Sequence, residues 1–226
     1  TSDNGAEGSN LIQFDETSVL DNWFDRVGYN ADYETLGERG SFNAIGPNNA
    51  TIAASPLAYY KFYASEGGLR VPLVMSGPGI SRHNEKTDEF VFVTDLTPTI
   101  LNLAGAENHA GSWNGKAVEQ IIGKDFSGFL NAEAASIHDE STPIGYELGG
   151  NQALFKGDYK LVFNLSAPAD RAWHLFNIKT DPGEANDLAE AEPIRFAQMR
   201  ADFEEYVRDN NVLPMPEGYV QGRQVF

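Results

Sequence analysis

The clearest structural signal in the sequence is a β-hairpin in its last third. Two short apolar runs, residues 153–155 and 159–163, flank Lys156-Gly157-Asp158, which has the glycine and aspartate that tight turns favour. A third run, Trp173–Ile178, is followed by a turn at Asp181-Pro182-Gly183. The three runs together predict a small antiparallel sheet.

An amphipathic helix is expected after the sheet, from about residue 193 to residue 209. It carries apolar residues three or four positions apart, which places them on one face. These residues are Phe196, Met199, Phe203 and Tyr206. A sheet covered by one helix forms an α+β subdomain, which we assign to residues 144–226.

Residues 1–143 show a pattern typical of the α/β class. The apolar run 69–75 ends at a Gly-Pro-Gly turn and predicts a buried strand. A second apolar run, 90–93, leads into a helix for which Thr97 is the expected N-cap, Pro98 the first helical residue and Gly105 the end. A strand, a turn and a capped helix in this order indicate an α/β domain.

Residues 6–58 are expected to be a long insertion into this α/β domain. The segment is rich in Gly, Asn and Asp, and it lacks a sustained hydrophobic period. Only a short helical patch near residues 19–24 is predicted within it. A structureless segment of this length is typical of a functional lid or of part of a larger fold.

The composition describes an acidic globular chain. Of its 226 residues 41% are hydrophobic and 12% aromatic, which suffices for a substantial core. The net charge of -17 repels phosphate backbones and excludes general nucleic-acid binding, and it disfavours heavily sulfated polymers as substrates. The absence of cysteine excludes disulfides and thiolate chemistry, and no apolar run reaches the ~20 residues of a membrane span.

Three short segments carry groups suited to chemistry. The carboxylate of Asp3 and the amide oxygen of Asn4 are hard donors for Ca²⁺ or Mg²⁺, although Asn-Gly is also a favoured hairpin turn. Two donors are fewer than the ~6–8 oxygens of a Ca²⁺ site. Lys61 lies among aromatic residues that favour an anion-binding ammonium or, alternatively, a surface lysine packed on rings. Glu66 and Arg70 are placed to pair across Gly67-Gly68, where a sharp turn is expected.

Other catalytic patterns are missing. The four histidines are far apart, and none has the spacing of a helical metal site. The G-x-S-x-G turn of serine hydrolases is absent.

Four segments, in their order along the chain, resemble the type I sulfatases of the alkaline phosphatase superfamily, and more closely the bacterial arylsulfatases. The first is Ser2-Asp3-Asn4-Gly5, similar to a metal-ligand motif. The second is Lys61 with Glu66–Pro72, similar to the catalytic-lysine segment. The others, Thr94–Gly105 and Leu175–Ala189, resemble a helix that follows a sheet strand and the strand and turn of the C-terminal subdomain.

The resemblance implies a fold and a partial active site. It implies the last strands and helices of a mixed-sheet domain in residues 1–143, followed by the α+β subdomain of residues 144–226. Asp3 and Asn4 would be two of four side-chain ligands of Ca²⁺, with Mg²⁺ less expected. Lys61 would contact the sulfate and the leaving-group oxygen, where negative charge grows as the ester is cleaved.

The resemblance also implies that part of the site lies elsewhere. The family's nucleophile is a formylglycine made from a C/S-x-P-x-R motif, which this sequence lacks. Because the chain opens at Thr1 without an initiator methionine, we expect it to be the C-terminal part of a longer protein, whose N-terminal half supplies the nucleophile and the remaining ligands. The family and its Ca²⁺ requirement favour the periplasm or secretion.

The expected activity of the whole protein is hydrolysis of a small sulfate monoester, aryl or alkyl, whereas this segment alone is expected to be inactive. Two alternatives remain at this point. One is a phosphonate or phosphate ester hydrolase on the same scaffold, because a divalent cation and a lysine serve either anion. The other is a non-catalytic Ca²⁺-binding interaction module.

Overall fold

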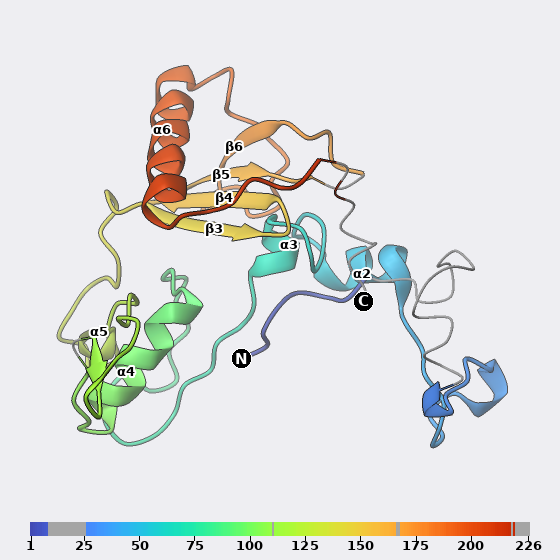
Figure 1. The fold of residues 1–226 in the computed structure, drawn as a ribbon, viewed down its shortest axis with the longest axis horizontal. Helices are drawn as coiled ribbons and strands as arrows, with labels where there is room; N and C mark the ends of the chain where they lie inside the picture. The colour runs from blue at the N-terminus through green and yellow to red at the C-terminus, as the bar shows by residue number, and fades with distance from the viewer. Residues whose placement is uncertain (9–25, 110, 166–167, 218, 220–226) are drawn as a thin grey trace. The chain divides into compact units, whose positions relative to one another are not determined.

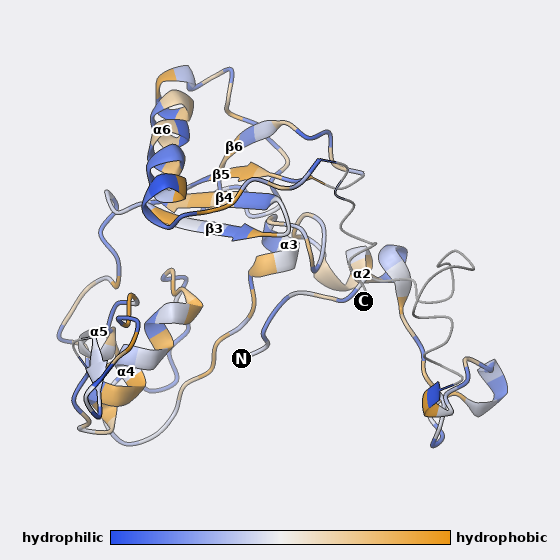
Figure 2. Ribbon diagram, viewed as in Figure 1, coloured by the Kyte–Doolittle hydropathy of each residue, from blue (hydrophilic) through white to orange (hydrophobic). Residues whose placement is uncertain are grey.

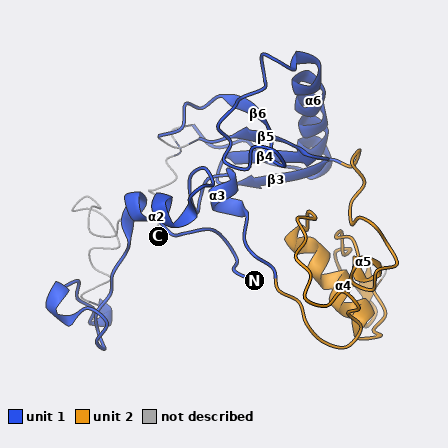
Figure 3. Ribbon diagram, turned by 180° about the vertical axis from the view of Figure 1, so that it is seen from behind, with its two compact units in different colours: residues 1–73, 143–226 blue, residues 74–142 orange. Residues whose placement is uncertain are grey.

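The computed structural model describes residues 1–8, 26–109, 111–165, 168–217 and 219. The chain divides into two compact units, residues 1–73 with 143–226 and residues 74–142 (Figure 3). Within the described ranges no helix is both long and apolar enough to cross a membrane. The helical patch predicted near residues 19–24 lies outside the described residues, and the division into domains 1–143 and 144–226 stays a prediction.

A four-stranded antiparallel sheet forms the centre of the first unit. In spatial order its strands are β3 (Ile144–Leu148), β4 (Asn151–Lys156), β5 (Tyr159–Phe163) and β6 (Trp173–Asn177), as Figure 1 shows. Lys156 lies opposite Tyr159 across a turn in which Gly157 has a φ of +57°, a conformation that suits glycine. The predicted hairpin and third strand are confirmed, and β3 adds a strand that its weakly apolar sequence did not indicate.

Helix α6 (Pro193–Asp209) packs on β4 and β5 and matches the predicted helix residue for residue. Met199 and Phe203 on α6 form a buried cluster with three leucines of the sheet. The leucines are Leu154, Leu161 and Leu175, which lie side by side in the strand register. In Figure 2, β4 and β5 combine hydrophobic and hydrophilic residues, and the two kinds also alternate around α6.

The strand predicted at residues 69–75 is not formed. Leu69 ends the short helix α3 (Glu66–Leu69), the residues after it belong to no hydrogen-bonded strand, and Val74 is 84% exposed. A strand needs a hydrogen-bonding neighbour on at least one side, and no described residue supplies one to this segment. Among the described residues this apolar run is at most partly buried.

The segment between the N-terminus and α3 contains regular structure that the sequence did not indicate. A 3-10 turn, η1, spans Tyr33–Thr35, and helix α2 spans Gly46–Ala54 with Pro47 in its first turn. Proline suits that place because its fixed φ is helical and its missing N–H would have no partner there. Only Ala50 of α2 is buried, which explains why no hydrophobic period marked the helix.

The second unit is built around helix α4 (Leu96–Leu103), which a 3-10 turn, η2 (Val93–Asp95), precedes. The predictions of Thr97 as N-cap and of Pro98 as the first helical residue are both wrong, because α4 begins at Leu96 and the buried Asp95 precedes it as the N-cap. Asp95 Oδ2 accepts the Phe92 N–H at 2.8 Å. Gly105 ends the helix as predicted, with a φ of +65°. The unit is completed by helix α5 (Ser127–Leu130) and the strand pair β1 (Ser112–Trp113) and β2 (Lys116–Ala117).

The chain thus has the α/β fold that was predicted. Its C-terminal part is the expected antiparallel sheet covered by one helix. The residues singled out for chemistry, namely Asp3, Asn4 and Lys61, all belong to the first unit.

Candidate active site

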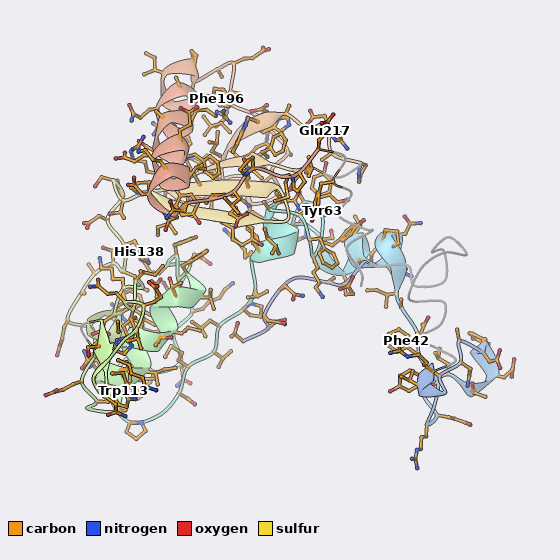
Figure 4. All side chains as sticks on the ribbon, viewed as in Figure 1. Phe42, Tyr63, Trp113, His138, Phe196 and Glu217 are labelled. Carbon is orange, nitrogen blue, oxygen red and sulfur yellow. The ribbon has the colours of Figure 1, made fainter. Side chains whose placement is uncertain are left out.

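Lys61 lies in a tight aromatic loop that precedes α3. Tyr59 and Phe62 have φ values of 59° and 82°, so the backbone turns sharply on either side of the lysine. The Tyr63 ring stacks on Tyr59 at 4.6 Å and meets Tyr60 edge-on at 5.1 Å. Tyr63, labelled in Figure 4, is buried, and burial raises the pKa of its hydroxyl group. This packing fixes the loop and leaves Lys61 with a third of its side chain exposed (33%).

The N-terminal segment that carries Asp3 and Asn4 runs beside this loop. The Gly5 N–H donates to the Gly68 carbonyl at 3.0 Å, and the Lys61 N–H donates to the Ala6 carbonyl at 2.9 Å. These two hydrogen bonds join segments more than 50 residues apart in sequence. The fold therefore brings the predicted ligand segment and the predicted catalytic lysine together.

Glycines make this close approach possible. A Cβ on Gly5 would lie 1.8 Å from the Gly67 carbonyl oxygen, and a Cβ on Gly67 would lie 2.2 Å from the carbonyl oxygen of Tyr59. Neither distance is physically possible, so both positions need glycine. Gly5 is not among the glycines with positive φ, which excludes the type I′ hairpin turn considered for Asn4-Gly5.

The Lys61 ammonium has an acidic partner that the sequence did not indicate. Its Nζ lies 2.6 Å from Glu7 Oε2 and 5.1 Å from the centroid of the Phe62 ring. Both side chains of the ion pair are partly exposed, so solvent reaches the ammonium. The predicted pairing of Glu66 with Arg70 is confirmed, with Arg70 Nε 2.6 Å from Glu66 Oε2.

Two buried asparagines of the sheet region hold the loop in place. Asn151 Nδ2 donates to the Phe62 carbonyl at 2.5 Å, next to Lys61. Asn164 Oδ1 accepts the Ala64 N–H at 2.7 Å. Asn164 Nδ2 also donates to Ser65 Oγ at 2.9 Å. No sequence signal could have found these residues, because their partners are about 90 to 100 positions away.

Asp3 and Asn4 offer part of a metal site. Asp3 is exposed, and Asn4 Nδ2 donates to the Gly5 carbonyl at 2.8 Å, which leaves the amide oxygen as the group that could bind a cation. Carboxylate and amide oxygens fit Ca²⁺, although about 6–8 donors are required. The structure, in the ranges it describes, contains no group of three or more His, Cys, Asp or Glu residues that could hold a metal ion. A complete site would need further ligands.

Two of the histidines form carboxylate pairs that involve neither the Lys61 loop nor the N-terminal segment. In the second unit, His138 Nε2 lies 2.8 Å from Oδ2 of the buried Asp95. In the first unit, His174 contacts Asp187 and Asp170 at 2.8 and 2.9 Å. Both pairs tie loops to regular elements.

Two family models match the chain. The model described as "N-sulphoglucosamine sulphohydrolase, C-terminal" matches residues 58–211, and the model described as "Sulfatase" matches residues 1–106. Lys61 and α3 fall within both matches, whereas Asp3 and Asn4 fall within the second only.

Individual relatives agree with these matches. An uncharacterized sulfatase of Schizosaccharomyces pombe is 31% identical over 221 residues, which cover 97% of this chain and 39% of that protein. An arylsulfatase of Klebsiella aerogenes is 31% identical over 135 residues, or 59% of this chain and 28% of that protein. A solved 2-O GAG sulfatase shares the fold with a TM-score of 0.53 at 19% identity, over 85% of this chain and 40% of that one. The chain thus spans well under half the length of the relatives it matches.

Proposed function

The chain belongs to the sulfatase family, and we propose that it forms the C-terminal part of an enzyme that hydrolyses sulfate monoesters. The observation that carries this proposal is the contact between the N-terminal segment and the Lys61 loop. The backbone hydrogen bonds from Gly5 to Gly68 and from Lys61 to Ala6 bring the segment that carries Asp3 and Asn4 alongside the loop that carries Lys61. An ammonium beside a divalent cation suits an ester whose leaving oxygen gains negative charge in the transition state.

The proposed roles follow from the chemistry of each side chain. Lys61 contacts the sulfate and the leaving oxygen of an aryl or alkyl ester. Asp3 and Asn4 contribute two ligands to Ca²⁺ rather than Mg²⁺, which demands octahedral geometry and keeps several waters. The bound ion would stabilise negative charge on the sulfate oxygens. The nucleophile, proposed to be a formylglycine, and the remaining ligands belong to the N-terminal half of the same protein.

Glu7 has a supporting role in this proposal. Its carboxylate lies 2.6 Å from Lys61 Nζ and keeps the ammonium at the edge of the aromatic loop. An ammonium has three N–H donors, so Lys61 can retain Glu7 and still donate to a substrate oxygen. The ion pair orients the lysine without occupying all of its hydrogen-bonding capacity.

The test is steady-state turnover of 4-nitrophenyl sulfate by the full-length protein and its Lys61→Ala variant. We expect kcat to fall about 10²–10³-fold, the usual cost of losing one group that stabilises transition-state charge. Lys179→Ala, a change to a lysine that is 69% exposed on the same unit, serves as the matched control and should leave kcat unchanged. Circular dichroism verifies that each variant is folded.

One outcome would contradict the proposed role of Lys61, and another would contradict the proposed substrate class. An unchanged kcat for Lys61→Ala would remove Lys61 from the mechanism. Robust hydrolysis of 4-nitrophenyl phosphate or a phosphonate ester, with no hydrolysis of the sulfate, would replace the sulfatase by a phosphoester hydrolase on the same scaffold.

A further inference from the structure

Lys160 is a completely buried lysine that joins three separate parts of the first unit. Its Nζ donates to Glu66 Oε1 at 2.9 Å, on α3. It also lies 2.8 Å from Glu184 Oε1, an ion pair whose geometry is not that of a hydrogen bond. The side chains of Lys160, Glu66 and Glu184 are 0%, 3% and 2% exposed, so this is an ion cluster within the protein interior.

The strand register explains why a lysine of an apolar strand is buried. Side chains alternate along β5, so Lys160 points away from the face on which Leu161 packs against α6. On its own face Lys160 lies between Phe155 and Phe176 of the neighbouring strands, with its Nζ 5.2 Å from the Phe155 ring centroid. The residues that approach this face are those of α3 and of the turn after β6.

Burying three charges is costly unless each is compensated. Glu66 is shared between Lys160 and Arg70, and Glu184 Oε2 accepts the Glu66 N–H at 3.2 Å, at the first turn of α3. The cluster therefore contains two cations and two anions. Buried ionic clusters add little net stability compared with apolar packing of the same volume. We therefore expect this cluster to select one arrangement of the chain instead of adding stability.

We propose that Lys160 is a positioning residue for Lys61. The cluster attaches α3 to the sheet, and α3 directly follows the loop that carries Lys61. Asn151 and Asn164 fix the middle of that loop, and Lys160 fixes its end. Without the cluster, the Lys61 ammonium would lose its fixed place beside the N-terminal segment. This inference rests on the proposed function of Lys61.

The test uses a pair of charge-balanced double variants in the full-length protein. Lys160→Met with Glu184→Gln removes one cation and one anion and leaves Glu66 paired with Arg70, which avoids an uncompensated buried charge. The matched control, Lys156→Met with Asp202→Asn, removes an ion pair of 2.7 Å between the same hairpin and α6. Each double variant is made in the wild-type background and in the Lys61→Ala background.

Four results are expected for Lys160→Met with Glu184→Gln. The kcat falls about 10–100-fold, because a misplacement of about 1 Å costs up to 10²-fold. KM changes less than about threefold, because the loss is specific to the transition state. In the Lys61→Ala background the same double variant causes no further loss of kcat. In the wild-type background it accelerates the hydrogen exchange of residues 58–70 but not that of α6. The control changes none of these quantities.

Other results would contradict the inference. An equal loss of kcat in both backgrounds would show that the cluster acts on the enzyme as a whole and not through Lys61. Unchanged exchange of residues 58–70 would show that the cluster does not hold the loop. If the wild-type protein turned over no sulfate ester, the proposed function would fail, and the exchange measurement alone would decide whether Lys160 positions the loop.

Discussion

His174 gives the sheet region a dependence on pH that can be traced to single atoms. Its Nδ1 lies 2.8 Å from Asp187 Oδ2 and its Nε2 lies 2.9 Å from Asp170 Oδ1, so only the doubly protonated ring can donate to both carboxylates. Burial by itself would lower the pKa of His174, but the hydrogen bonds and charges of Asp170 and Asp187 raise it above its ordinary value. Burial likewise opposes ionisation of Asp187, yet N–H donors and His174 bring its pKa below the usual range.

The sign of the pH dependence follows from these directions. The contribution of His174 is fully present below about pH 6.5 and is lost as the pH rises through its raised pKa. The hydrogen bond from His174 lowers the pKa of Asp170 as well. The contributions of Asp170 and Asp187 are therefore present above about pH 3.9 and are lost as the pH falls through their lowered pKa values. We therefore expect His174→Gln to lower the urea midpoint most near about pH 5.5 and clearly less near pH 8.5. If the difference in urea midpoint between wild type and His174→Gln were equal at both pH values, the charge of His174 would not contribute to stability.

The residues of the candidate site differ in how far the sequence could predict them. Asp3, Asn4 and Lys61 lie in short motifs, so their types and spacing were visible without a structure; their roles stay predictions. Glu7 and Lys160 were not found, because their importance depends on contacts that only the fold creates. A lysine within an apolar strand normally indicates that its face of the sheet is exposed to solvent. Lys160 is buried because Glu66 and Glu184, from distant segments, cover that face.

Among the elements, those stabilised by local sequence were predicted and those that depend on distant partners were not. The hairpin has its turn residues between its two strands, and α6 has its own apolar period, so neither needed further information. The start of α4 was missed because Asp95 is held by groups outside the helix, including the Lys124 N–H at 2.7 Å. Residues 69–75 have strand composition but no neighbouring strand among the residues described.

The packing of α6 on the sheet can be tested with two substitutions in one helix. Phe203 is 3% exposed, and its ring lies 5.0 Å from that of Trp173 within the cluster that α6 forms with the sheet leucines. Phe203→Ala should lower the free energy of unfolding by about 3–5 kcal/mol, because it removes buried contacts and leaves a cavity. Ile194→Ala, at a position that is 86% exposed, should change it by less than about 0.5 kcal/mol. Urea unfolding followed by circular dichroism gives both values, and similar losses for the two variants would contradict the packing described.

At the scale of the whole molecule, our proposal divides the site into groups assigned to this chain and groups assigned to the N-terminal half of the same protein. Among the described residues, Lys61 pairs with Glu7, and no group of three or more His, Cys, Asp or Glu residues is able to hold a metal ion. The chain also matches only 39% and 28% of the length of two relatives named as sulfatases. A fold can be largely formed while its active site is incomplete, because catalysis requires every group of the site.

This division predicts how residues 1–226 behave when they are produced alone. Calorimetric titration with Ca²⁺ should give binding no tighter than about 10⁻³ M, the weak end of the protein range, because two donors cannot replace a full shell of ~6–8 oxygens. Residues 1–226 alone should also not hydrolyse 4-nitrophenyl sulfate. The full-length protein should bind Ca²⁺ tightly, and Asp3→Ala should abolish that tight binding. Stoichiometric binding near 10⁻⁶ M, a range typical of sensor proteins, would instead favour a self-contained Ca²⁺-binding module. Asp3→Ala in residues 1–226 distinguishes the two possibilities. It should abolish Ca²⁺ binding if these residues form a self-contained module, and it should change the weak binding very little if they hold only two of the ligands.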